Sequence, residues 1–253
     1  VIAYNLCNDS VVSETRGFTL FDPAMISGLG LWLAADIGIT KDISNNVSAW
    51  ADQSVNGNDA QQLTGSLQPV FVDSVIDTKP ALRFDGGDDI LEGGIISGLD
   101  SSSFTLFIVS SGAVQAQNKT AIIFGINNYS NGFLIARRTY LADQFIKVYN
   151  NSPGVLTSAP NSFPNTGYPP TILSYRKEID TFSELFTNGS LSSGSADSLL
   201  NAGFTNSNYS IGEPGSFSGT SIEGDIAEII LYDSLLSDSL RGMVEQYLRY
   251  KYA

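Results

Sequence analysis

The sequence predicts an all-β protein, an antiparallel β-sandwich of the jelly-roll type with one helix at its C-terminal end. Short apolar or alternating segments recur along the chain, each bounded by Gly, Asn, Ser or Pro. Turn residues return at intervals of roughly 10–15 positions, which is typical of a sandwich and not of alternating strand–helix units. A chain of 253 residues can bury a core without a disulfide or a metal.

The predicted strands are short and rich in β-branched and aromatic residues. An Asn188-Gly189 pair between apolar flanks predicts a tight hairpin. The longest predicted strand, residues 222–232, comes last (IEGDIAEIILY). The other strands are expected at residues 104–110, 121–126, 132–136, 145–149 and 171–175.

The C-terminal segment predicts one amphipathic helix. Ser237 is a suitable N-cap, and Asp238 in the first turn favours the helix dipole. Arg249 and Lys251 place positive charge in the last turn, near the unpaired carbonyl groups. A stripe of apolar side chains is expected to cover a sheet edge or face, and consists of Leu240, Met243, Val244, Tyr247 and Leu248.

Composition excludes several classes of function. The 13 basic and 26 acidic residues give a net charge of −13, so no nucleic-acid partner is expected. The longest nearly apolar stretch, residues 24–35, is too short to span a bilayer, and no membrane insertion is expected. Without His and with Cys7 alone, the chain has no His-based triad, imidazole-bound zinc or internal disulfide. Carboxylate chemistry remains, which suits calcium or cleavage of a glycosidic bond.

Three stretches of sequence carry a resemblance to a known family. They are LGLWLAAD with VSAWADQSVNGNDA (residues 29–36 and 47–60), PALRFDGGDDIL (80–91), and GDIAEIILYD with the helix that follows it (224–252). With these segments the chain resembles the laminin-G-like branch of the concanavalin A-like lectin/glucanase superfamily.

The resemblance implies a concanavalin A-like jelly roll over residues 22–253. Residues 1–21 fall outside it and are predicted to be an arm or linker that reaches a neighbouring domain or subunit. Similar domains occur in bacterial surface and secreted proteins and in virion proteins, so an extracellular, cell-surface or virion location is expected. The fold serves binding modules, adhesins, assembly proteins and a minority of enzymes.

Carboxylates in two regions suggest calcium, which takes six to eight oxygen ligands. A Gly-Gly turn at residues 85–89 brings three carboxylates together; the alternative is a solvated acidic turn. The loop at residues 52–59 offers further oxygens, or satisfies its own backbone as an Asx-turn loop. The resemblance implies that the last long strand adds a carboxylate to a structural calcium site. The candidate ligands are Asp36, Asp59, Asp85, Asp88, Asp89, Asp225 and Glu228.

Three acids in the last strand match the E-x-D-x-x-E spacing of retaining β-glucanases with this fold, namely Glu223, Asp225 and Glu228. In such enzymes a bulged strand brings two carboxylates to about 5–5.5 Å on the concave face. The position in the final strand and the presence of only two Trp residues argue against catalysis. The prediction is therefore of a non-enzymatic protein.

Aromatic residues in polar loops suggest glycan binding, because sugars stack their C–H faces on exposed rings while polar groups bind the hydroxyls. The alternative is that these rings cap the core. Arg137, in the adjacent pair Arg137-Arg138, would engage an acidic sugar or a partner protein, or lie on a solvated strand end. The candidate aromatic residues are Tyr129, Tyr140, Phe163 and Tyr168.

The function predicted from the sequence is a non-catalytic, lectin-like glycan-binding or adhesion module of a larger extracellular or virion-surface protein, with calcium as a structural ion. A second hypothesis is a structural or decoration protein of a phage particle or cell-surface layer, assembled through residues 1–21. The third is a polysaccharide-cleaving enzyme that uses the three acids of the last strand.

Overall fold

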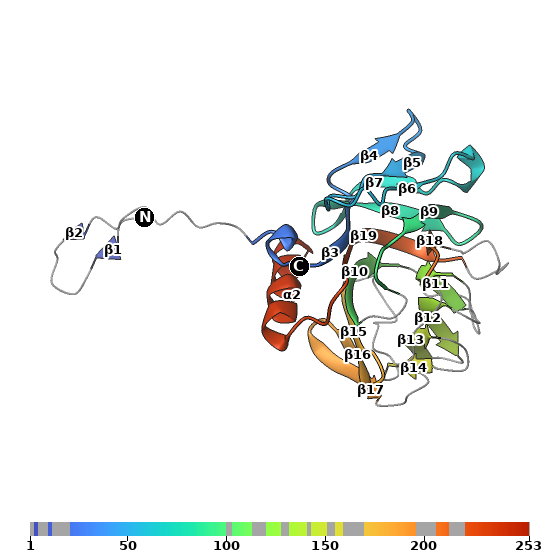
Figure 1. The fold of residues 1–253 in the computed structure, drawn as a ribbon. Helices are drawn as coiled ribbons and strands as arrows, with labels where there is room; N and C mark the ends of the chain where they lie inside the picture. Colours follow the sequence, from blue (N-terminus) through green and yellow to red (C-terminus); the bar gives the residue numbers. More distant parts are fainter. Residues whose placement is uncertain are drawn as a thin grey trace.

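The computed structural model is an antiparallel β-sandwich, as predicted from the sequence, and two stacked sheets make up most of it (Figure 1). The backbone at positions 3–4, 10–11, 139–140, 143–144 and 155–156 is described without its side chains. The structure describes residues 3–4, 10–11, 21–99, 103–112, 120–127, 132–140, 143–150, 155–158, 170–195, 206–212 and 221–252.

Sheet I contains eight strands within the described residues, and all of its pairings are antiparallel. From one edge to the other the strands are β17 (Ser190–Ser195), β16 (Phe182–Thr187), β15 (Thr171–Glu178), β10 (Phe104–Ser111), β19 (Glu223–Tyr232), β8 (Lys79–Asp85) and β7 (Val70–Ile76), with β3 (Leu29–Ala34) also paired to β19.

Sheet II contains nine strands among the same residues and is also antiparallel. Its order is β14 (Val155–Thr157), β13 (Asp143–Asn150), β12 (Phe133–Tyr140), β11 (Thr120–Ile126), β18 (Asn208–Gly212), β9 (Ile90–Ile95), β6 (Ala60–Gln61), β5 (Val47–Trp50) and β4 (Ile39–Lys41).

The remaining elements are short except for the C-terminal helix. The strands β1 (Ala3–Tyr4) and β2 (Ser10–Val11) pair only with each other. No helix in the described parts of the chain is long and apolar enough to cross a membrane. The helical elements are η1 (Pro23–Met25), η2 (Gly65–Leu67) and α2 (Asp238–Tyr252).

The main core lies between the two sheets and follows from the alternation of side chains along each strand. In β10 the even positions, including Leu106 and Ile108, point into this core, whereas Phe107 and Val109 point to the outer face of sheet I. Trp50 is fully buried in the same core, as expected from its strand context. Because β10 is buried on both faces, it appears in the sequence as a continuous apolar run.

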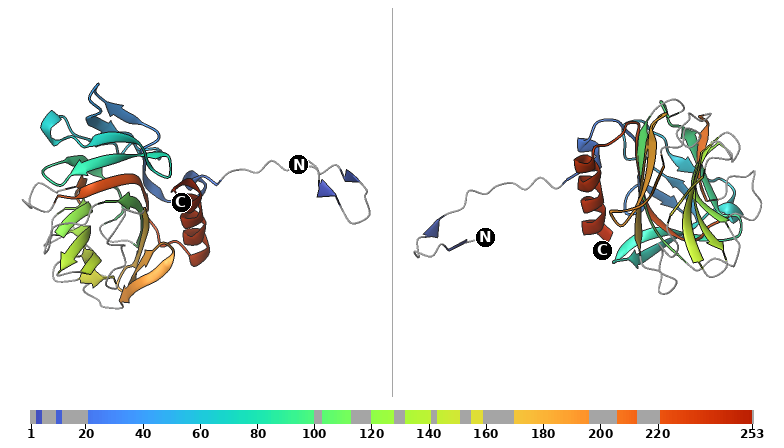
Figure 2. Two further views of the ribbon diagram at one scale, coloured as in Figure 1. Left: turned by 180° about the vertical axis from the view of Figure 1, so that it is seen from behind. Right: turned by 90° about the horizontal axis from the view of Figure 1, so that it is seen from below.

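Helix α2 packs on the outer face of sheet I, on the side of the sandwich opposite to β11–β13 (Figure 2). The predicted helix and its N-cap are confirmed, since the backbone N–H of Leu240 donates to Ser237 Oγ at 3.3 Å. The predicted apolar stripe is partly wrong, because Met243 is exposed. The buried helix residues are Val244, Glu245, Leu248 and Tyr252.

Two further expectations can be compared with the fold. The Asn188-Gly189 hairpin is confirmed, because both residues have positive φ angles, 50° and 82°, between β16 and β17. Phe21, which the sequence places at the end of the arm, packs against Tyr247 of α2 with 5.9 Å between ring centroids and a tilt of 57°. The packed part of the chain therefore includes Phe21.

Candidate functional site

A groove of about 270 Å³ lies on the outer face of sheet II, over β12, β13 and β14. Its position follows from the strand register. Arg138 in β12 lies opposite Phe145 in β13, and Lys147 in β13 lies opposite Thr157 in β14. Side chains that face each other across antiparallel strands point to the same side, so these four residues together line the groove.

Neighbouring residues confirm which face this is. Ile135, Ile146 and Val148 alternate with the groove residues and belong to the core between the sheets. On the outer face a small buried apolar cluster adjoins the groove and includes Ala136 and Tyr149. The four groove residues are half-buried, so the groove combines a partly accessible aromatic ring with a hydroxyl and two cations.

The two cations of the groove have no salt-bridge partner among the described residues. No acidic side chain lies within salt-bridge distance of Arg138 or Lys147 in that part of the chain. Burial, and then repulsion from Arg138, lowers the pKa of Lys147. Among the described residues, the groove therefore carries two positive charges without a salt-bridge partner, on a chain whose net charge is −13.

Arg137 has a different environment from the one expected. It is only 6% exposed and lies between the sheets, where its guanidinium donates to Ser110 Oγ of β10 at 3.0 Å. Burial lowers the pKa of Arg137 to about 10, while the charge of Asp225 acts in the opposite direction. The prediction of a solvated or glycan-contacting Arg137 is wrong, because strand alternation directs it inward and directs Arg138 outward.

The predicted aromatic contacts cannot be placed in the groove. Tyr129, Phe163 and Tyr168 lie outside the described residues. Tyr140 ends β12, where the backbone alone is described. Phe145 lines the groove but was not predicted. The alternation of residues along its strand shows that Phe145 and Ile146 lie on opposite faces, but it does not show which face is covered by the other sheet.

A larger cavity of about 490 Å³ lies at one end of the sandwich, between residues 24–30 and the 52–59 loop. Several polar side chains in and beside it already have partners. The amides of Asn56 and Asn58 donate to the carbonyl oxygen of Gly30 at 3.2 and 3.0 Å. The carboxylate of Asp52 accepts from the backbone N–H groups of Trp32, Ser54 and Asn58. The loop therefore satisfies its own backbone, as the Asx-turn alternative predicts.

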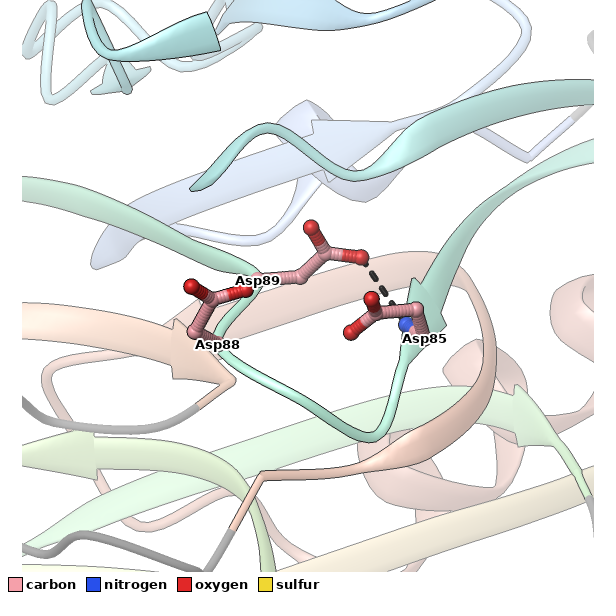
Figure 3. A group of neighbouring side chains, drawn as sticks. All are labelled: Asp85, Asp88 and Asp89. Atoms are coloured by element: carbon pink, nitrogen blue, oxygen red, sulfur yellow. Dashed lines mark hydrogen bonds between the residues drawn. The ribbon is translucent and has the colours of Figure 1, made fainter. Parts of the chain in front are cut away.

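The turn between β8 and β9 brings three carboxylates together (Figure 3). Asp85 and Asp88 are exposed and Asp89 is buried, and one oxygen of each lies within 4.8 Å of the others. Asp89 Oδ2 accepts from the backbone N–H of Asp85 at 2.8 Å. Burial raises the pKa of Asp89 to about 6, with a further contribution from the charges of Asp85 and Asp88.

These acids fit the oxygen chemistry that calcium requires. Their mutual repulsion is the condition that a divalent cation relieves, and two of the three are open to solvent. The other predicted ligands do not join them. Among the described residues, no second group of three or more acidic side chains converges in this way. Asp59 instead accepts from the backbone N–H of Asp52, and Asp36 binds Lys251.

A β-bulge brings the three acids of β19 to one face. Val109 of β10 lies opposite Glu228, but Ser110 lies opposite Ile226, so Ala227 is the extra residue. The bulge shifts the alternation, and Ala227 and Glu228 both face away from the core between the sheets. That face is the one covered by α2, which does not leave an open cleft over Glu228.

Glu228 is 1% exposed and links β19 to the helix. Its carboxylate accepts from Trp32 Nε1 at 2.8 Å, from Tyr247 Oη at 2.9 Å and from Tyr252 Oη at 2.7 Å. Lys251 Nζ lies 2.8 Å from Glu228 Oε2, the oxygen that also accepts from Tyr252, and donates to Asp36 as well. With these donors in place, a substrate or metal cannot reach Glu228. The expectation that Glu228 is a calcium ligand is therefore wrong, and so is the catalytic role that the third hypothesis gives it.

The other two acids of the motif have separate roles. Asp225 binds Arg83 through two bonds, at 2.7 and 3.1 Å. It also accepts from Ser111 Oγ at 3.3 Å. Glu223 is exposed at the start of β19, opposite Asp85 in the register. Because Asp225 is bound by Arg83 and Glu228 is covered by the helix, the retaining pair that the spacing suggested is not formed.

Comparison with solved structures shows the fold alone, because the sequence identities are low. The binding domain of botulinum neurotoxin serotype D has a TM-score of 0.62 at 11% identity, with 87% of this chain and 50% of that chain covered. Domain 4 of an extracellular arabinanase from Geobacillus stearothermophilus, solved with arabinotriose, has a TM-score of 0.59 at 16% identity, with 87% and 97% covered.

An arabinofuranosidase complexed with arabinofuranosyl-α-1,2-xylobiose gives a TM-score of 0.62 at 13% identity, with 80% and 50% covered. This chain thus spans about half the length of the neurotoxin binding domain and of the arabinofuranosidase. No protein-family model and no curated protein matches the sequence. The structural neighbours are β-sandwich domains of toxins and glycoside hydrolases, which places this chain in that fold class.

Proposed function

We propose that this protein is a non-catalytic glycan-binding module of the laminin-G-like type, part of a larger extracellular, cell-surface or virion protein. The groove on the outer face of sheet II carries the proposal. Carbohydrate-binding sites combine an apolar or aromatic surface with a few convergent polar groups, and the groove offers Phe145, Thr157 and two cations.

The comparisons support the same reading. Two of the neighbours with this fold were solved with oligosaccharides, one with arabinotriose and one with arabinofuranosyl-α-1,2-xylobiose. A third is the binding domain of a neurotoxin. The environment of Glu228 also favours binding over cleavage, because the carboxylate that hydrolysis would need stabilises the helix instead.

Each groove residue has a distinct task in this proposal. The ring of Phe145 stacks against the C–H face of a sugar, and the hydroxyl of Thr157 exchanges hydrogen bonds with sugar hydroxyls. Arg138 and Lys147 donate hydrogen bonds from either side of the ring.

The test is binding of the full chain to a panel of neutral and acidic polysaccharides by affinity electrophoresis or a glycan array. Phe145→Ala is expected to lower affinity for a bound glycan at least about tenfold, since stacking and burial of one ring are lost. Tyr250→Ala removes an exposed ring on α2, far from the groove face, and is expected to leave binding unchanged. Uniform failure to bind, with and without calcium, would remove the proposal.

We also propose a structural calcium ion at Asp85, Asp88 and Asp89. Three carboxylates on one turn, two of them exposed, support it, together with the repulsion that raises the pKa of Asp89. Because the turn joins β8 of sheet I to β9 of sheet II, an ion there would hold these two strands of the two sheets together.

The assembly hypothesis keeps one supporting observation. The strands β1 and β2 form a small sheet apart from the sandwich sheets, in the segment predicted to be an arm. Light scattering of the full chain and of a chain lacking residues 1–20 tests it. An oligomer that depends on those residues would support a structural or decoration protein over a glycan-binding module.

A further inference from the structure

We propose that the groove on sheet II selects acidic saccharides, and that Arg138 and Lys147 bind the carboxylate or sulfate group of the sugar together. The inference rests on the proposed function and narrows it to one class of ligand. Its basis is the placement of two cations on one face, with an aromatic ring and a hydroxyl beside them.

The charge balance of the molecule bears on this placement. The chain has 13 basic against 26 acidic residues, so acidic partners for a cation are abundant. Five of the other described cations form salt bridges with them: Arg83 pairs with Asp225, Arg176 with Glu184, Arg241 and Arg249 with Glu245, and Lys251 with Glu228. Arg138 and Lys147 have no such pair among the described residues.

The register sets the two cations at a distance that one anion can bridge. Arg138 lies opposite Phe145, and Lys147 is two positions further along the same strand. Such a diagonal pair has Cα atoms about 7–8 Å apart, within reach of two long side chains that converge on one group. Arg presents a planar pair of donors that fits a carboxylate or sulfate, and Lys adds a compact charge.

The electrostatics favour an anion from outside the protein. Two half-buried like charges repel each other, and water screens that repulsion less at a half-buried site than at an exposed one. The repulsion is visible in Lys147, whose pKa is lowered by burial and by Arg138. A bound anion attracts both cations. The closeness of Arg138 and Lys147, which costs free energy in the unliganded groove, therefore contributes to the affinity for an anionic ligand.

The surrounding groups fix the rest of the ligand. Phe145 neighbours both cations: it lies opposite Arg138 on the adjacent strand and two positions from Lys147 on its own strand. Thr157 lies opposite Lys147 on the next strand, β14. A pyranose ring stacked on Phe145 would therefore direct a ring substituent to the cations while its hydroxyls reach Thr157. A uronic acid or a sulfated sugar has this shape, with the anion attached directly to a ring that keeps an apolar face.

Calorimetric titration with matched pairs of polysaccharides tests the inference. Polygalacturonate and its methyl ester form the carboxylate pair, and dextran sulfate and dextran form the sulfate pair. We expect at least about tenfold tighter binding to one charged member than to its neutral counterpart, with affinity that falls as salt is raised. The pair that shows the difference identifies the anion.

Variants then assign the effect to the groove. Arg138→Gln and Lys147→Gln are each expected to lower affinity for the charged polysaccharide about tenfold or more, and to leave any binding of the neutral one unchanged. Lys79→Gln in β8 of sheet I makes the same change in net charge and serves as the control.

The outcomes separate this inference from the proposed function. Equal affinity for charged and neutral members, lost in Phe145→Ala but not in Arg138→Gln, would overturn the anionic selectivity and retain glycan binding. Equal losses in Arg138→Gln and Lys79→Gln would overturn the assignment to the groove. Absence of binding to all four polysaccharides would overturn both the proposed function and this inference.

Discussion

Arg137 and Arg138 are consecutive in β12, yet their guanidinium groups lie on opposite faces of sheet II. Arg137 is buried between the sheets and donates to Ser110 of sheet I, whereas Arg138 lines the groove on the outer face. One residue thus joins the two layers of the sandwich, and the next belongs to the candidate binding site. Their substitutions should have different effects.

Arg137→Ala is expected to destabilise the fold by about 3 kcal/mol, because it leaves a cavity and removes the buried donor to Ser110. Arg138→Ala, one residue away, should change the free energy of unfolding by no more than about 0.5 kcal/mol. Urea denaturation of the two variants measures the difference. Equal stability of the two would contradict the placement of Arg137 between the sheets.

Glu228→Gln should destabilise the protein by about 2–3 kcal/mol, because three neutral donors and Lys251 lose a buried anionic acceptor. Glu223→Gln alters an exposed acid of the same strand and should change stability by no more than about 0.5 kcal/mol. Thermal and urea unfolding test the pair. If Glu228→Gln left stability unchanged, the role of Glu228 in attaching α2 would be wrong.

Gly93→Ala should destabilise the protein by about 1–3 kcal/mol, since the added Cβ would lie 2.1 Å from the ring of Tyr209. The ring cannot move freely, because it is buried and stacks on Phe124 with 5.7 Å between centroids. Gly94→Ala is the control, with no heavy atom within 4 Å of the added Cβ. A similar midpoint of urea unfolding for both variants would argue against the packing of Tyr209 over β9.

Asp89 makes stability depend on pH. Its pKa is raised to about 6 in the folded protein, above the value of about 3.9 expected in the unfolded chain, so the folded state binds the proton more tightly. This contribution is fully present below about pH 4 and is lost as pH rises through about 6. Asp89→Asn should therefore be more stable than the wild type at pH 7, by about 1 kcal/mol after solvent screening, and not at pH 4.

Calcium binding should stabilise the turn that the ionised Asp89 destabilises at pH 7. Millimolar CaCl₂ at pH 7 is expected to raise the melting temperature of the wild type by several degrees, because ions bind the folded state. Asp85→Asn and Asp88→Asn should abolish the rise, and EDTA should reverse it in the wild type. A rise that persists in both variants would place the ion elsewhere and overturn the proposed calcium site.

Local patterns predicted most of the fold. The long strand at residues 222–232, the Asn188-Gly189 hairpin and the helix capped by Ser237 were each identified by short-range signals, namely apolar runs, turn chemistry and capping. Each signal depends on residues close in the chain, where propensity and periodicity act directly. The position of the helix on sheet I and the order of the strands depend on contacts between distant residues, and sequence periodicity does not report these.

The candidate site was predicted less well for the same reason. The spacing of Glu223, Asp225 and Glu228 correctly suggested a bulge, but only the packed helix makes Glu228 a buried acceptor. The pattern that could have indicated this lies at the C-terminal end of the helix. There the side chains of Tyr247, Lys251 and Tyr252 all direct donor groups to the carboxylate of Glu228. These donors predict a buried acceptor only once it is known that the helix packs against β19.

The sequence by itself determined that this chain forms an antiparallel sandwich with one C-terminal helix, and that it contains no His and a single Cys for catalysis or metal binding. Only the tertiary structure decided which of two adjacent arginines faces outward, which acids meet and which are covered. The physical reason is that alternation along a strand specifies two faces but not their surroundings. The stacking of a second sheet and a helix determines which face is buried and which remains available to a ligand.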